Sequence, residues 1–177
     1  MDSFKVIQQM KSSTLRNYVL PGLDSSLLGN GIVRIFESSR DTEEHITPHS
    51  HRFDFACFVM RGWVENTVYT LANEGQELAD LFVMATLKYL GSTGKYEVDQ
   101  GTEPLMFDRN TETYVKGQWY SMSSAEIHSI KFSRDAVVLF FEGPNVTSET
   151  SILEPCAHGK RVPTFKVHDW MFEKAEP

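Results

Sequence analysis

The sequence has little cysteine, no long apolar run and no excess of basic residues. Its two cysteines, Cys57 and Cys156, lie about a hundred positions apart and form no CxxC motif. We therefore expect a reducing compartment, the cytoplasm, and no disulfide framework. The first residues lack the basic start and apolar run of a signal peptide, and no segment reaches the roughly 18 apolar residues of a membrane span.

The charge balance excludes a broad surface for polyanions. Lys and Arg number 17 against 24 Asp and Glu, which gives a net charge of −7, whereas general nucleic-acid binders are basic. We therefore expect neither a nucleic acid nor a membrane as partner. The 177 residues, 41% of them hydrophobic, are enough for one folded domain with its own core.

Aromatic residues are plentiful at 12%, and short β-branched and aromatic runs recur along the chain. Turn residues separate these runs every 8–12 positions or so, a pattern typical of a β-barrel or sandwich. The expected strands are residues 32–36, 53–60, 64–71, 96–98, 105–107, 112–115, 119–122, 127–132 and 136–142. Residues 78–90 suit a helix or strands, and residues 3–20 suit a short helix. We divide the chain into an N-terminal arm or helix (1–30), a barrel (31–144) and a tail packed on the barrel (145–177).

Three of the six histidines have a spacing that suits a metal site. His49-Ser50-His51 lies at the entrance of a predicted strand, where residues i and i+2 face the same side. Both imidazoles can then point into one cavity. A third ligand should come from a neighbouring strand, and His128 directly precedes an apolar alternating run. The alternative is a set of surface or hydrogen-bonded histidines. We leave His45, His158 and His168 out of the site.

Glycine spacing around these histidines adds a resemblance. Gly62 follows His51 by eleven positions, and Gly117 precedes His128 by eleven. Residues 49–62 and 117–128 therefore resemble the two motifs of the cupin superfamily. This resemblance implies a mostly-β, single double-stranded barrel from about Ile32 to Pro144, holding a divalent metal on the three histidines. A cupin barrel with a degenerate or empty site remains the alternative.

Departures from the two motifs refine this resemblance. Phe55 and Ala56 stand where the first motif has Glu, and Ser123 and Ala125 replace Pro and Gly of the second. A three-histidine face is left, which resembles that of the thiol (cysteine) dioxygenases and implies Fe(II), with Zn, Ni or Mn as alternatives. The Ser-His-Tyr group that those enzymes carry downstream is missing. The long separation of the motifs suggests an added hairpin around residues 91–94. Because cupins are commonly dimers, the resemblance also implies that this chain forms a homodimer.

Alternation along the strands supplies further candidates for substrate binding and proton transfer. Counting by twos from His51 places Phe53, Phe55 and Cys57 on the same strand face as the metal ligands. Arg52 and Asp54 would then face outward. Glu126 lies two residues before His128, and its carboxylate could serve as a fourth metal ligand or as an acid/base. The candidates for substrate binding are Phe53, Phe55, Cys57, Met122 and Arg34, and those for proton transfer are Glu126 and Tyr120. Residues 167–174 suit a terminal helix or strand.

Together these features predict a metal-dependent cupin, a non-haem Fe(II) dioxygenase acting on a small molecule such as a thiol or small acid. Two alternatives stay open. One is a non-catalytic cupin that binds a small ligand or regulates a partner. The other is an isomerase or lyase that uses histidine and tyrosine in the same cavity without a metal.

Overall fold

The structure is a computed structural model, and it describes residues 3–18, 20–29, 31–41, 47–73, 80–90, 96–157 and 160–161. Its elements are α1 (Ser3–Gln9), β1 (Lys11–Leu15), β2 (Leu23–Leu28), β3 (Val33–Ser38), β4 (Phe53–Arg61), β5 (Trp63–Leu71), β6 (Asp80–Tyr89), β7 (Tyr96–Val115), β8 (Trp119–Met122), β9 (Ile127–Phe132), β10 (Val137–Asn145), β11 (Glu149–Ala157) and β12 (Lys160–Arg161). Within these described ranges, no helix has both the length and the apolar character needed to cross a membrane.

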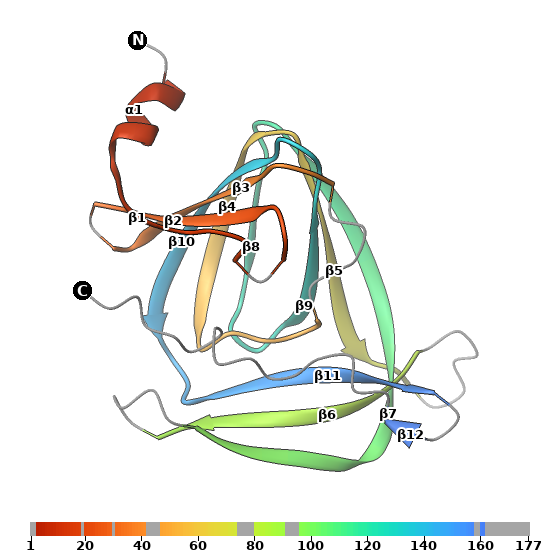
Figure 1. The fold of residues 1–177 in the computed structure, drawn as a ribbon. Helices are drawn as coiled ribbons and strands as arrows, with labels where there is room; N and C mark the ends of the chain where they lie inside the picture. The colour runs from red at the N-terminus through yellow and green to blue at the C-terminus, as the bar shows by residue number, and fades with distance from the viewer. Residues whose placement is uncertain are drawn as a thin grey trace.

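Two six-stranded antiparallel sheets curl toward each other and enclose the core (Figure 1). One has the order β1-β2-β3-β10-β4-β8, and the other β12-β11-β6-β7-β5-β9. The largest buried cluster lies between them and takes side chains from strands of both sheets, including Phe55, Val59, Val64, Phe132 and Val138. The predicted mostly-β, cupin-type double-stranded barrel is confirmed.

The N-terminal helix is shorter than the predicted residues 3–20. It ends at Gln9, and residues 11–15 form β1, because Ser13, Thr14 and Leu15 pair with β2 instead of continuing the helix. The Thr14 hydroxyl lies 2.8 Å from that of Ser26 on β2. The helix packs Ile7 against a small cluster on the outer side of the first sheet, made of Leu28, Ile35 and Val137.

The predicted hairpin between the two motifs is present as β6 and β7. The ambiguous segment 78–90 is a strand over residues 80–89, and its loop, 91–95, lies outside the described residues. The predicted short strands 96–98, 105–107 and 112–115 form one long strand, β7. This strand pairs first with β6 and then with β5, so it runs from the hairpin into the barrel wall (Figure 1).

The segments before and after the predicted barrel also contribute strands. β2 pairs with β3 in the first sheet, and β11 pairs with β6 in the second. The proposed boundaries at residues 30 and 144 stay a prediction. His45, His158, His168 and the predicted terminal element at 167–174 lie outside the described residues.

The turn between β4 and β5 explains the first motif glycine. Gly62 has φ +70°, a left-handed conformation that costs an L-residue energy. A Cβ there would lie 2.5 Å from Ser133 Oγ and 2.9 Å from Ala136 Cα. The tight turn therefore needs glycine for both conformation and space, and it sets where β4 ends.

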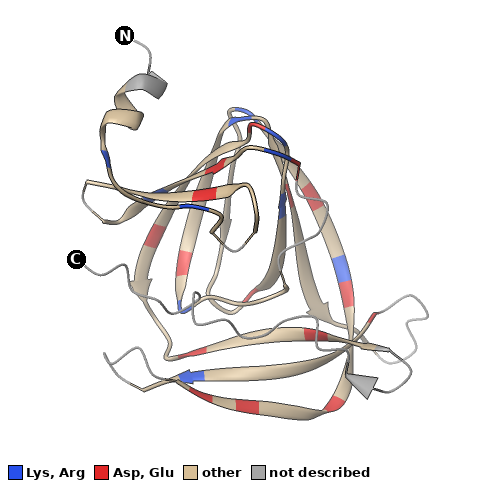
Figure 2. Cartoon of the chain, in the orientation of Figure 1, with Lys and Arg blue, Asp and Glu red and all other residues tan. Residues whose placement is uncertain are grey.

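Charged residues are dispersed over the fold. In Figure 2 acidic and basic segments are interspersed along the strands of both sheets. The charges of the described residues are thus spread over both sheets rather than gathered on one strand.

Candidate metal centre

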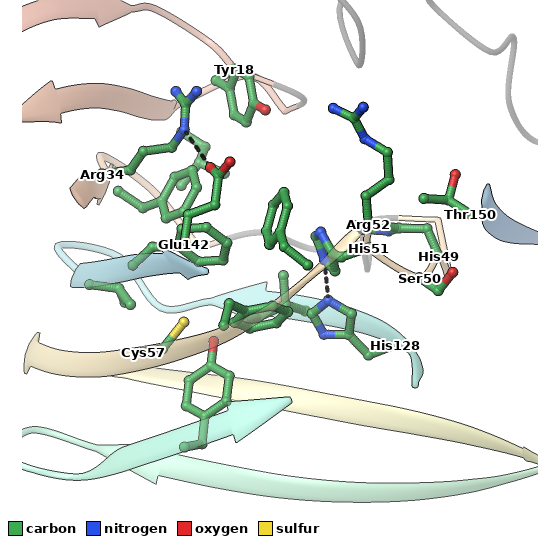
Figure 3. A pocket seen from close by; sticks show the side chains of 18 of the residues that line it. Tyr18, Arg34, His49, Ser50, His51, Arg52, Cys57, His128, Glu142 and Thr150 are labelled. Carbon is green, nitrogen blue, oxygen red and sulfur yellow. Dashed lines mark hydrogen bonds and ion pairs between the residues drawn. The ribbon is translucent and has the colours of Figure 1, made fainter. Parts of the chain in front are cut away.

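The three predicted histidines meet between the two sheets. His49 forms isolated β-bridges with His128 on β9 and with Ile152 on β11. Its backbone N donates to His128 O at 2.8 Å, and His128 N donates back to His49 O at 2.9 Å. His51 lies two residues further on, just before β4. One nitrogen from each ring falls within 4.8 Å of the others, and the Nε2 atoms of His51 and His128 are 3.0 Å apart (Figure 3).

Two of the rings are oriented by hydrogen bonds behind the site. His128 Nδ1–H donates to Asn66 Oδ1 at 2.7 Å, and His49 Nδ1–H donates to the Thr47 carbonyl at 2.7 Å. The Asn66 amide is itself oriented, because its Nδ2 donates to the Met122 sulfur at 3.4 Å. With each Nδ1 protonated, the Nε2 lone pairs of these two rings are left for a cation.

Burial keeps the imidazoles neutral. It lowers the pKa of His49, although the hydrogen bond to the Thr47 carbonyl works in the opposite direction. It lowers the pKa of His51 and His128 well below the ordinary 6.5, and the neighbouring rings of the group add to the effect. Neutral imidazole is the form that binds metals, so the group needs no deprotonation at neutral pH.

The donor set fits a divalent transition metal. Two nitrogens that bind one ion at about 2.1 Å and at right angles are about 3.0 Å apart, which is the separation between the His51 and His128 Nε2 atoms. Three imidazoles suit Fe, Zn, Ni or Cu, and the donor set alone does not choose among them. Among the described residues no carboxylate joins the group.

A cavity of about 270 Å³ opens beside the histidines, a size suited to a small molecule. Its wall next to the histidines is aromatic. The ring of Phe55 lies 4.8 Å from that of His51, 5.5 Å from that of His128 and 4.8 Å from that of Phe140. Phe53 lies 5.4 Å from His51. The wall excludes water from one side of the group.

The cavity also contains most of the other predicted site residues, and their roles in binding or proton transfer stay predictions. Phe53, Phe55 and Cys57 line it, as alternation predicted, together with Arg34 and Tyr120. Burial raises the pKa of Cys57 to about 12 and that of Tyr120 well above its ordinary value, and the two groups are hydrogen-bonded to each other. The Tyr120 phenol is therefore protonated at neutral pH.

Two predicted residues are not among those that line the cavity. Met122 is buried and contacts Asn66 behind His128. Glu126 is exposed, and its carboxylate accepts hydrogen bonds from the backbone N and hydroxyl of Ser123, at 2.7 and 3.0 Å. Because the turn before β9 uses this carboxylate, the structure does not bring it to the histidines.

Arg52 lies elsewhere than predicted. It lines the cavity, and its guanidinium carbon sits 4.1 Å from the ring centroid of Tyr89. The prediction extended strand alternation to residue 52, but β4 begins only at Phe53. Asp54 faces outward as predicted, and it accepts a hydrogen bond from Ser124 N at 2.7 Å.

Sequence reasoning missed Asn66, Glu142 and Tyr18. Asn66 is only 4% exposed and occupies an inward position of β5, so a polar residue in the alternating pattern was the available signal. Glu142 and Tyr18 reach the mouth of the cavity from β10 and from the segment after β1. Nothing in the linear sequence places either beside the histidines.

Comparisons with known proteins give distant structural similarities only. No family model matches the chain, and no curated protein matches it. The chain is similar to the Drosophila melanogaster CENP-C bound to CAL1, with 10% identity and a TM-score of 0.44, over 80% of this chain and 95% of that one. It is similar to hydroxypropylphosphonic acid epoxidase from S. wedmorenis, with 7% identity and a TM-score of 0.42, over 73% and 54%. It is also similar to hydroquinone 1,2-dioxygenase from Sphingomonas sp. TTNP3, with 13% identity and a TM-score of 0.36, over 64% of this chain and 61% of that one.

The strand order and the place of the histidines, and not these similarities, decide what the fold is. Two curled antiparallel sheets enclose the cavity, and the HxH segment lies directly beside His128 at its wall. The chain is a cupin-type double-stranded β-barrel whose three-histidine group fits a divalent metal.

Proposed function

We propose that the protein is a metal-dependent cupin enzyme, a non-haem Fe(II) dioxygenase acting on a small molecule. The observation that carries the proposal is the three-histidine group, neutral and with converging nitrogens, beside a cavity of about 270 Å³. Three ligands on one face leave coordination positions open for substrate and O₂. The chemistry that Fe(II) supplies in such a site is electron transfer to O₂.

The chain's own residues have three tasks in this proposal. His49, His51 and His128 hold the ion. The Phe53 and Phe55 rings pack against the substrate and exclude water from the reacting atoms. Tyr120, protonated at neutral pH, could donate a hydrogen bond to a bound substrate but could not act as a base that removes a proton.

A second candidate is a non-catalytic cupin that binds a small ligand. One observation favours it. Glu142 is the sole carboxylate among the described residues that line the cavity, and it is paired with Arg34 at 3.9 Å. No lining carboxylate is thus left unpaired to serve as a general base for a reaction that needs one.

Metal content tests the first proposal. Protein purified without a histidine tag is loaded anaerobically with Fe(II), and the bound iron is measured. We expect about one ion per chain, lost in His51→Ala and His128→Ala, and retained in the matched variant Arg61→Gln on the outer end of β4. Sub-stoichiometric iron in the wild type, or full iron in both histidine variants, would overturn the metalloenzyme.

Oxygen uptake then separates the two candidates. The loaded protein is supplied with thiols, diketones and small carboxylic acids in an oxygen electrode. Uptake that requires both substrate and iron supports the dioxygenase. Bound iron with no uptake across the panel supports the ligand-binding cupin instead. Conversion of a substrate in the presence of chelator would point to the metal-independent isomerase or lyase.

A further inference from the structure

The mouth of the cavity carries one more positive than negative charge. Among the described residues that line the cavity, the charged ones are Arg34, Arg52 and Glu142. Glu142 lies 3.9 Å from Arg34; burial raises the pKa of Glu142 above its ordinary value, and both guanidinium groups act against that shift, that of Arg34 more strongly. The single carboxylate is therefore committed first to Arg34, and Arg52 is the cation in excess.

Arg52 is held in place by contacts that leave its hydrogen-bond donors available. Its backbone carbonyl accepts from Val146 N at 2.8 Å and Thr147 N at 3.3 Å, which fixes the main chain. Its guanidinium stacks over the half-buried Tyr89 ring at 4.1 Å. A cation–π contact uses the face of the guanidinium, whereas its N–H groups lie in the plane. Within the described part of the chain, no acidic side chain lies within ion-pair distance of Arg52.

The cavity thus changes along its length, from an apolar wall beside the histidines to positive charge at its mouth. The aromatic wall lies against His51 and His128, and in Figure 3 Arg52 extends away from His128 and Cys57, toward the side where Arg34 and Tyr18 lie. A ligand that reaches the histidines must lay its middle part against Phe53 and Phe55. Its far end then meets a half-buried guanidinium, which pairs best with a planar anion such as a carboxylate.

We propose that the cavity selects small carboxylates with an apolar body, and that Arg52, stacked on Tyr89, is the residue that recognises the carboxylate. This inference rests on one part of the proposed function, namely that the substrate binds in this cavity. Arg52 is a specificity-determining residue in this assignment. The apolar body is matched by the phenylalanine wall, and neutral molecules of the same shape are disfavoured because they leave the guanidinium without a counter-charge.

The test uses the metal-free protein, so that direct binding of a carboxylate to an ion plays no part. NMR-detected titrations compare benzoate with benzamide, which has the same shape without the charge. We expect benzoate to bind about tenfold more tightly, as for a charge-assisted hydrogen bond in a half-buried site. Arg52→Gln should abolish this preference. Glu142→Gln should leave it intact or increase it, because it removes the competing carboxylate.

Controls keep the result interpretable. Arg61→Gln removes an exposed arginine whose Nε donates to the Asp135 carbonyl, and it should leave the preference unchanged. Arg52→Lys keeps the charge and serves if Arg52→Gln fails to fold, with a reduced preference expected. Equal affinities for the two ligands in the wild type, no binding of benzoate, or an unchanged preference in the Arg52 variants would overturn the inference.

The two proposals fail separately. A protein that prefers benzoate but binds no iron keeps the carboxylate site and loses the dioxygenase. A protein that holds iron on its histidines but shows no preference keeps the metal centre and loses the role of Arg52.

Discussion

The Nε2 atoms of His51 and His128 lie 3.0 Å apart, although the residues are 77 positions apart in sequence: His51 lies just before β4 of the first sheet, and His128 lies in β9 of the second. With His128 Nδ1–H bonded to Asn66, His128 Nε2 is an acceptor, so His51 Nε2–H donates to it in the metal-free protein. A metal ion would replace this hydrogen bond with two coordinate bonds. The pair is therefore already assembled before the ion binds.

Asn66 should control metal affinity without touching the metal. Asn66→Leu keeps the size of the side chain but removes the acceptor for His128 Nδ1–H, so the ring loses its orientation and fixed tautomer. We expect metal binding weaker by about 10–100-fold, measured by competition with a chelator. Asn66→Asp restores an acceptor and should recover most of the affinity. Equal affinities for wild type and Asn66→Leu would contradict this role.

The stability of the metal-free protein should fall as the pH drops below about 6.5. In the folded state the pKa values of the three histidines are lowered, mainly by burial, so between those values and 6.5 the unfolded chain binds more protons. The contribution of the neutral histidines to the free energy of unfolding is fully present above pH 6.5. It is lost as the pH falls, by at most about 1.4 kcal/mol per pH unit for each residue.

Urea denaturation at pH 7.5, 6.5 and 5.5 measures this slope. Carboxylates titrate as well, so the control is a triple variant with His49→Gln, His51→Gln and His128→Gln. The difference between the two slopes isolates the histidines. Identical slopes for wild type and triple variant would show that the buried rings do not lower stability in acid.

The two motif glycines should differ in their sensitivity to alanine. Gly62 and Gly117 both have left-handed φ angles, +70° and +90°, but only Gly62 lacks room for a Cβ. Gly117→Ala should cost about 1–2 kcal/mol for the conformation alone. Gly62→Ala should cost a further 1–3 kcal/mol or so, because the Cα and N of Ala136 are backbone atoms that cannot rotate away. Equal losses in urea denaturation would refute the steric explanation.

Cys57 should resist alkylation in the folded protein. It is 2% exposed and burial raises its pKa to about 12, so little thiolate is present at pH 8. Cys156 is only half-buried. Iodoacetamide should label Cys57 at a rate limited by unfolding, as followed by peptide mass spectrometry. The variant Cys156→Ser should give almost no labelling until denaturant is added, and rapid labelling of this variant under native conditions would disprove the prediction.

Local patterns predicted the barrel well where strand alternation is regular. Phe53, Phe55 and Cys57 follow His51 by twos and all line the cavity. The same rule was wrong for Arg52, because the chain before β4 does not alternate: residues 49–53 all line the cavity. The N-terminal helix was predicted too long, because pairing of β1 with β2 outweighs the weak helical pattern after Gln9.

The sequence by itself determined the class of fold, the turn glycines and the three candidate ligands, because these follow from periodicity and backbone conformation over a few residues. Only the tertiary structure decided which polar groups meet around the cavity. Asn66 reaches His128 across the pairing of β5 with β9, and Arg52 finds Tyr89 on β6. Glu126, close to His128 in sequence, instead turns back to Ser123. Contacts between strands distant in sequence depend on which strands become neighbours in a sheet, and no local pattern encodes that order.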